Sequence, residues 1–354
     1  MKELYILPYV SFFDAHDVAL RDWLRINDDA GVRKYMGAPG SAQRLFPENA
    51  RRALAWADSA FDELRRLMVT IASDAVFLDI STDHDRLEEA YNLKALSSQE
   101  LWCEYTGFLF RSPDGEVKRE FYRKYMAPLV EGMSGLIEGR RAYFYDVDEA
   151  ARSRFIPVCD AAFDANADFM LALARLASRM GGFREAPRHI WHTTPMLRQK
   201  AVLYEESAAF HAGLMSTLAR LLKARTRGYI VRNIHEQAYD FLSRYERFLD
   251  MKSEVDSQRM NNIVDRVLSQ DEVRAVMLCE PMHFMSMRQG LERAAEIFPE
   301  MRLGKTDITI LLKRMSRFTQ MFRNMQANYV FALDVLGVEM RERYSMVGEI
   351  VPGV

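Results

Sequence analysis

Hydrophobic residues recur at helical spacing along most of the chain, and this pattern predicts a protein built almost entirely of α-helices. The segment 47–78 begins with Pro47, which the first turn of a helix tolerates, and continues with Phe61, Leu64 and Leu67 at helical spacing. The predicted helices cover residues 15–26, 47–78, 86–110, 116–138, 147–180, 196–225, 229–251, 253–269, 283–297 and 306–347.

Signals for β-strands are nearly absent from the sequence. The apolar segment Leu4–Phe13 fits either a short strand or an extended strap, and we expect residues 1–14 to form an N-terminal strap. The 17 glycines and 11 prolines cluster between the predicted helices, and no linker clearly divides the chain. We therefore expect an all-α fold, with residues 1–354 forming one domain that is a single large α-helical bundle around a central apolar cavity.

Composition narrows the classes of function. A net charge of -2 creates no field that favours nucleic acid, and no run of 18 apolar residues predicts a membrane span. The N-terminus lacks the pattern of a signal peptide, so we expect a cytoplasmic protein. Three cysteines lie far apart in the sequence, which argues against a disulfide framework and favours reduced thiols.

One acidic cluster follows Phe77 at the end of the predicted helix 47–78. Asp79 and Asp83 are four residues apart, so on a helix they would share one face. Paired carboxylates can hold Mg²⁺, a hard cation that prefers oxygen ligands and bound phosphate. The alternative is a polar helix end followed by a cap.

A second acidic cluster lies where the predicted helices 229–251 and 253–269 meet. Asp250 and Glu254 share a helix face, and Ser253 lies beside them. Their oxygen atoms suit a further Mg²⁺ ion. The alternative is a solvated junction between two helices.

Two arginines are candidates for binding a diphosphate. Arg198 follows a proline-containing loop, and Arg343 stands next to Tyr344 near the C-terminus. A guanidinium fork binds phosphate oxygens in a bidentate manner. Taken singly, each of these arginines is also typical of a protein surface.

The order of these features resembles that of the class I terpene synthases of bacterial type, with degenerate metal-binding motifs. Five segments carry the resemblance: Leu7-Pro8-Tyr9 with Ala19–Leu24, the acidic cluster after Phe77, Pro187 to Arg198, Asp250–Ser253, and Arg343-Tyr344. The sequence departs from the second metal motif of that family. Leu249 stands where asparagine is expected, and Ser257 stands where glutamate is expected.

The resemblance implies Mg²⁺-dependent ionisation and cyclisation of a prenyl diphosphate, a lyase reaction of secondary metabolism. In that interpretation Asp79, Asp83, Asp250, Ser253 and Glu254 bind the metal. Arg198, Arg343 and Tyr344 stabilise the departing diphosphate. An apolar, aromatic-lined pocket would then hold the carbocation away from water.

Two other functions stay open at this point. A helical haem or non-haem iron oxygenase would bind its iron through His211, His235 or His283. A non-catalytic helical binding protein would need no complete metal motif. In each case we expect a small-molecule ligand, no nucleic acid and no membrane span, with a homodimer left open.

Overall fold

The computed structural model contains a parallel β-sheet of five strands in the order β3-β2-β4-β1-β5. The structure describes residues 1–9, 59–109, 127–180, 212–218, 220, 224–315 and 320–337. The strands are β1 (Lys2–Pro8), β2 (Ala75–Ser81), β3 (Arg141–Asp146), β4 (Arg274–Cys279) and β5 (Met301–Leu303). The prediction of an all-α bundle is therefore wrong, because the sheet is the centre of an α/β structure.

The strands escaped detection because both faces of the sheet are covered. All seven residues of β2 are buried, and so are all residues of β3 and β4 except the first of each. A strand buried on both faces has a continuous apolar run instead of alternation, and periodicity alone cannot separate such a run from a buried helix. The predicted helix 47–78 accordingly ran into β2, whereas β3 and β4 fell in gaps between predicted helices.

The N-terminal segment is not a strap. β1 pairs in parallel with β4 on one side and with β5 on the other, so Lys2–Pro8 lies inside the sheet. Residues 10–14 of the predicted strap lie outside the described residues. The buried side chains of Leu4 and Leu7 point to opposite faces of the sheet and belong to two different hydrophobic clusters.

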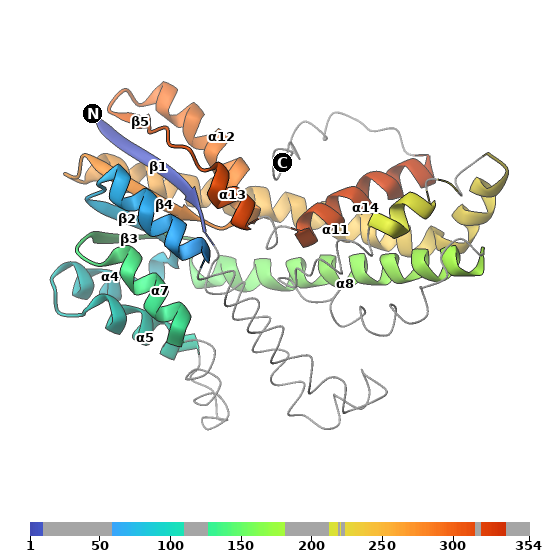
Figure 1. Ribbon diagram of the computed structural model, residues 1–354, viewed down its shortest axis with the longest axis horizontal. Coiled ribbons are helices and arrows are strands. Elements are labelled where there is room, and N and C mark those ends of the chain that lie inside the picture. The colour runs from blue at the N-terminus through green and yellow to red at the C-terminus, as the bar shows by residue number, and fades with distance from the viewer. Residues whose placement is uncertain are drawn as a thin grey trace.

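Helices make up most of the remaining described chain, and Figure 1 shows their arrangement. A helical stretch over 59–71 and a 3₁₀ turn over Thr82–His84 flank β2. The other described helices with complete bounds are α4 (Asp85–Asn92), α5 (Ser98–Leu109), α7 (Ala127–Ile137), α8 (Glu149–Arg179), α11 (Ala224–Ser269), α12 (Pro281–Ile297), α13 (Thr309–Met315) and α14 (Gln320–Leu336).

The two faces of the sheet pack against different helices. Val76 and Leu78 of β2 belong to a cluster with the helical stretch 59–71, α5 and α7. Phe77 points to the other face, where the C-terminal half of α11 and the helix α12 cover the sheet. This alternation of side chains along β2 produces the three-layer α/β arrangement.

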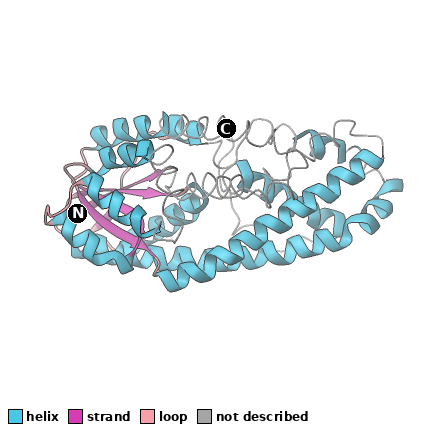
Figure 2. Cartoon of the chain, turned by 90° about the horizontal axis from the view of Figure 1, so that it is seen from below, coloured by secondary structure: helices cyan, strands magenta, loops and turns pink. Residues whose placement is uncertain are grey.

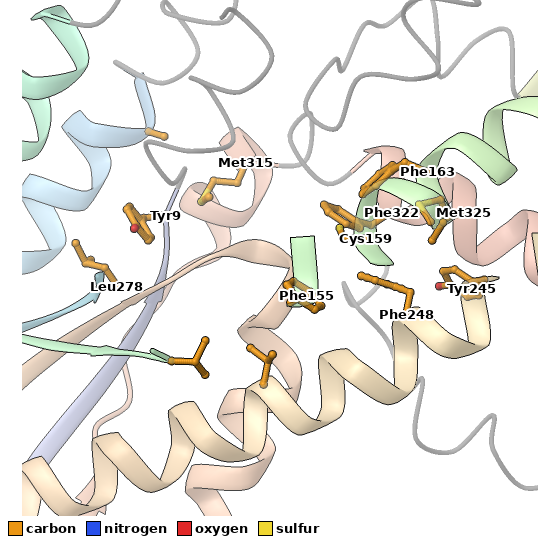
Figure 3. Packing of buried hydrophobic residues seen from close by; sticks show 14 of the residues in the cluster. Tyr9, Phe155, Cys159, Phe163, Tyr245, Phe248, Leu278, Met315, Phe322 and Met325 are labelled. Carbon is orange, nitrogen blue, oxygen red and sulfur yellow. The ribbon is translucent and has the colours of Figure 1, made fainter. Parts of the chain in front are cut away.

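A helical arm, defined here as α8, the N-terminal half of α11 and α14, extends away from the sheet (Figures 1 and 2). Its centre is aromatic: the rings of Phe169 and Phe241 stack with centroids 5.4 Å apart, and Phe163 meets Phe322 edge-on at 5.5 Å. In Figure 3, Phe155 and Phe248 lie where the arm meets the sheet. None of the helices in the described part of the chain is long and apolar enough to cross a membrane.

Candidate functional site

Charged and polar side chains gather at the carboxyl end of the sheet. Tyr9 follows β1, Asp79 lies near the end of β2, Asp146 ends β3 and Glu280 follows β4. Because the strands are parallel, these four positions meet at one edge. Open parallel sheets usually bind their ligands at this carboxyl edge. The ligand lies where the connections that follow two neighbouring strands run to opposite faces of the sheet.

Asp79 is buried deep within this edge, with only 4% of its surface exposed. The hydroxyl of Tyr9 donates a hydrogen bond to Asp79 Oδ1. Burial raises the pKa of Asp79 well above its ordinary value, and the nearby carboxylate of Glu280 raises the pKa further. Asp79 therefore holds a proton under conditions in which an exposed aspartate has lost its own.

Asp146 and Arg259 form a buried ion pair beside Asp79. Arg259 Nε lies 2.5 Å from Asp146 Oδ1, and Arg152 Nη1 lies 3.9 Å from Asp146 Oδ2. Burial opposes ionisation of Asp146, but Arg259 and then Arg152 hold the pKa of this carboxyl below its usual range. Asp146 is thus an ionised carboxylate that fixes the position of the Arg259 guanidinium.

The Arg259 guanidinium has one donor to spare. Its Nη1 atom is buried and has no hydrogen-bond partner among the described residues. A buried donor without a partner destabilises a fold by roughly 1–3 kcal/mol, and more when it is charged. An unsatisfied donor in a buried charged cluster suits the binding of an acceptor from a ligand.

A second buried cluster joins α11 to α12. Asp256 on α11 accepts a hydrogen bond from Lys252 Nζ at 2.6 Å and another from Ser286 Oγ at 2.5 Å. Its other oxygen, Oδ1, contacts Nδ1 of His283 on α12. Although burial opposes ionisation of Asp256, the charge of Lys252 and the hydrogen bonds from His283 and Lys252 keep its pKa far below the usual range.

His283 is fully buried and is oriented by Asp256. Burial lowers the pKa of the imidazole, and the positive charge of Arg259 lowers it further. A hydrogen bond from Nδ1–H to Asp256 leaves Nε2 as the acceptor nitrogen of a neutral ring. Nε2 has no hydrogen-bond partner in the described chain, and Glu280 Oε2 lies 3.7 Å away.

The spacing of residues on α11 and α12 explains how the two clusters meet. Lys252, Asp256 and Arg259 are separated by four and three residues, so they share one buried face of α11. Glu280 and His283 are three residues apart at the start of α12. Sequence reasoning missed Lys252, Asp256, Arg259 and Glu280, although the helical spacing of oppositely charged residues in an otherwise amphipathic helix was a usable signal.

The structure separates the two predicted metal clusters. The second cluster is exposed on α11: Asp250, Ser253 and Glu254. These residues do not lie on the buried face of α11 that holds Asp256. Asp79 is in a strand and Asp83 is in the following 3₁₀ turn, so these two residues do not share a helix face. Asp83 instead accepts a hydrogen bond of 2.8 Å from the backbone N–H of Glu149 at the start of α8.

Other predicted site residues lie apart from this edge or outside the described chain. Arg198, His211, Arg343 and Tyr344 lie outside the described residues, and His235 is exposed on α11. Within the described residues, no group of three or more histidine, cysteine or acidic side chains is arranged to hold a metal ion.

Neither a family model, nor a curated protein, nor a solved structure matches this chain.

Proposed function

We propose that the protein is a hydrolase in which His283 is the general base and Asp79 is the general acid. The observation that carries this proposal is the buried Asp256–His283 pair, whose Nε2 atom has no hydrogen-bond partner among the described residues. Two titratable groups whose surroundings move their pKa values in opposite directions are typical of an acid and a base that work together.

The role of His283 follows from its partners. The carboxylate of Asp256 holds the ring by Nδ1, as an orienting carboxylate does for a catalytic imidazole, and leaves Nε2 to accept a proton. The lowered pKa keeps the ring neutral near pH 7, which is the form that a base requires. Asp256 also stabilises the imidazolium that forms when Nε2 takes a proton from water.

Asp79 supplies the complementary proton. Its raised pKa keeps a dissociable proton on a carboxyl group at the same edge of the sheet. In the proposed step, His283 removes a proton from water, the water oxygen bonds to the electrophilic atom, and Asp79 gives its proton to the leaving group. The proton then passes from His283 through solvent back to Asp79, which restores both groups.

Water is a better candidate for the nucleophile than the nearby Cys279. Burial raises the pKa of the Cys279 thiol well above its ordinary value, so the reactive thiolate is disfavoured. The side chain of Ser286 is not available either, since its hydroxyl donates to Asp256 and accepts from Lys252 at 2.9 Å. The proposal therefore needs no covalent intermediate with the protein.

Ionisation of a prenyl diphosphate stays a prediction, as do its Mg²⁺ cofactor and the haem or iron alternative. Its diphosphate-binding residues Arg198, Arg343 and Tyr344 lie outside the described chain. The hydrolase proposal has better support because the groups it needs lie in two adjoining buried clusters, with Arg259 and Glu280 near both Asp79 and His283. Location in the cytoplasm and the state of assembly also remain predictions.

A panel of chromogenic substrates tests the proposal. Nitrophenyl esters, phosphates and glycosides are incubated with the full-length protein and with His283→Gln, and nitrophenol release is followed from pH 4 to 10. We expect turnover of at least one class, a loss of about 10²–10⁴-fold in His283→Gln, and a bell-shaped pH profile. The rising limb reports the base and the falling limb reports the acid.

The matched control is His235→Gln, since His235 is an exposed histidine on α11. This variant should retain full activity. Turnover of none of the three classes, or equal activity of the His283→Gln variant and the wild type, would contradict the proposal. Circular dichroism of each variant verifies that it folds.

A further inference from the structure

We propose that the site binds an uncharged sugar, whose neighbouring hydroxyl groups bridge Arg259 Nη1 and the carboxylate of Glu280, so that the bond hydrolysed is a glycosidic bond. This inference rests on the proposed hydrolase function and names its substrate class. It is carried by the hydrogen-bonding groups that the cluster leaves unsatisfied and by the balance of charge around them.

The unsatisfied groups include both a donor and acceptors. Arg259 Nη1 is a donor without a partner in the described chain, and the Arg259 residue is 6% exposed. His283 Nε2, in a side chain with no exposed surface, is an unpartnered acceptor. Glu280 lies 3.7 Å from that nitrogen and is an acceptor when ionised.

Hydroxyl groups match this set. Each hydroxyl donates one hydrogen bond and can accept two, so one hydroxyl can accept from Arg259 and donate to a carboxylate. A ligand that carries only acceptors satisfies Arg259 but leaves Glu280 and His283 Nε2 without donors. An acidic side chain beyond the end of a parallel strand also binds ribose hydroxyls in other α/β folds.

The local charge disfavours an anionic ligand. Three carboxylates, Asp146, Glu149 and Glu280, surround the two guanidinium groups of Arg152 and Arg259. Lys252 and Asp256 neutralise each other in a separate pair. A phosphate or carboxylate ligand would add to an existing excess of negative charge, whereas an uncharged ligand would not.

The proposed base and acid, His283 and Asp79, also fit the cleavage of a glycosidic bond. In the proposed step the water oxygen bonds to the anomeric carbon while His283 takes the water proton. The bond between the anomeric carbon and the leaving oxygen breaks, and the leaving oxygen receives the proton of Asp79. Protonation of that oxygen by a carboxylic acid with a raised pKa is the usual acid step of glycoside hydrolysis.

Ligand-observed NMR tests binding separately from catalysis. Saturation-transfer spectra of the full-length protein are recorded with D-ribose, with D-glucose, with their phosphates and with inorganic phosphate. We expect transfer to at least one free sugar, and no competition by inorganic phosphate. Glu280→Gln should weaken sugar binding by about tenfold or more, because a hydrogen bond to an ionised group is lost.

Two further variants keep the test interpretable. Arg259→Lys retains the positive charge but lacks the Nη1 donor, so it should also weaken sugar binding. Arg288→Lys, at an exposed position on α12 whose Nε lies 3.1 Å from Glu292, should bind as the wild type does. If Arg259→Lys does not fold, Glu280→Gln decides the question alone.

The outcomes separate this inference from the hydrolase proposal. Hydrolysis of esters or phosphates without glycoside turnover or sugar binding overturns the inference and leaves the hydrolase proposal standing. Sugar binding that needs Glu280, without turnover of any substrate class, supports the sugar site and overturns both the hydrolase proposal and the glycosidic cleavage. Displacement of a bound sugar by inorganic phosphate, or no sugar binding at all, overturns the inference.

Discussion

The carboxyl edge of the sheet and the helical arm are both buried, but they are filled with different chemistry. At the edge, Asp79, Asp146, Arg259 and His283 are buried, with exposed fractions of 4%, 1%, 6% and 0%. In the arm, stacked aromatic rings such as those of Phe169 and Phe241 occupy the centre. Helix α11 passes through both regions, so the difference does not arise from the type of element.

This difference separates packing from chemistry. Aromatic and aliphatic side chains provide most of the buried surface of the arm, which also holds the buried amides of Asn166, Asn324 and Asn328. Buried ion pairs contribute little to stability compared with apolar side chains of similar size, because removing charges from water is unfavourable. A charged cluster at a sheet edge is thus better explained by function than by stability, and substitutions that keep the shape of a side chain test this difference between the two regions.

The largest effect is expected from Arg259→Met at the edge of the sheet. This change keeps the approximate shape of the side chain but leaves Asp146 buried without its closest partner, 2.5 Å away. Breaking one half of a buried ion pair should reduce the free energy of unfolding by about 3–5 kcal/mol. Urea denaturation at pH 7 measures the change.

An exposed ion pair provides the matched control. Arg288→Met removes the exposed partner of Glu292 and should change the free energy of unfolding by less than about 1 kcal/mol. If Arg259→Met and Arg288→Met change the free energy of unfolding equally, the Arg259–Asp146 pair contributes no more to stability than an exposed ion pair does.

Asp79→Asn should have an intermediate effect that depends on pH. The raised pKa means that folded Asp79 retains a proton that the unfolded chain releases above about pH 4. Its contribution to stability therefore falls as the pH rises from about 4 towards neutrality. Because asparagine does not titrate, the variant should be more stable than the wild type at pH 7, but not at pH 4.

The same variant distinguishes a catalytic acid from a structural residue. Asp79→Asn should lose hydrolysis although it gains stability at pH 7, since asparagine cannot donate a proton as an acid does. Parallel urea titrations at the two pH values and the nitrophenyl assay give both quantities. A stability difference that does not change between pH 4 and 7 would rule out the raised pKa.

The smallest effect is expected in the arm. Leu173 of α8 has no exposed surface, and Leu173→Met conserves its volume and apolar character. Such a swap should reduce the free energy of unfolding by less than about 1.5 kcal/mol and leave hydrolysis unchanged. A larger loss of stability, or a loss of activity, would mean that the arm does more than support the sheet edge by packing.

The sequence was a good guide to the long helices and a poor guide to the sheet. The prediction of a helix over 147–180 agrees closely with α8, and 283–297 agrees with α12, because amphipathic helices leave a periodic pattern. The segment Ala75–Ser81 carried no such contrast, since every residue of β2 is buried. α11 was predicted as two helices with a break at Lys252, but it is one helix of 46 residues.

The candidate site was only partly accessible to sequence reasoning. Asp79 and His283 were singled out, but as ligands for Mg²⁺ and iron, and those roles depended on a helical framework that the sheet replaces. Around residue 250 the acidic pattern pointed to exposed carboxylates, whereas the buried Asp256 lies six residues further along. Which face of α11 meets the sheet depends on contacts with β3 and α12, distant segments that local spacing does not encode.

The continuity of α11 has a mechanical consequence. At about 1.5 Å per residue, the helix is a rod roughly 70 Å long that carries Phe241 of the arm and Arg259 of the sheet edge on one rigid backbone. A single residue inserted between them would rotate everything beyond it by roughly 100° and swing either the aromatic rings or the guanidinium into solvent. The distance between these two positions is therefore fixed, and length changes in this protein should accumulate elsewhere along the chain.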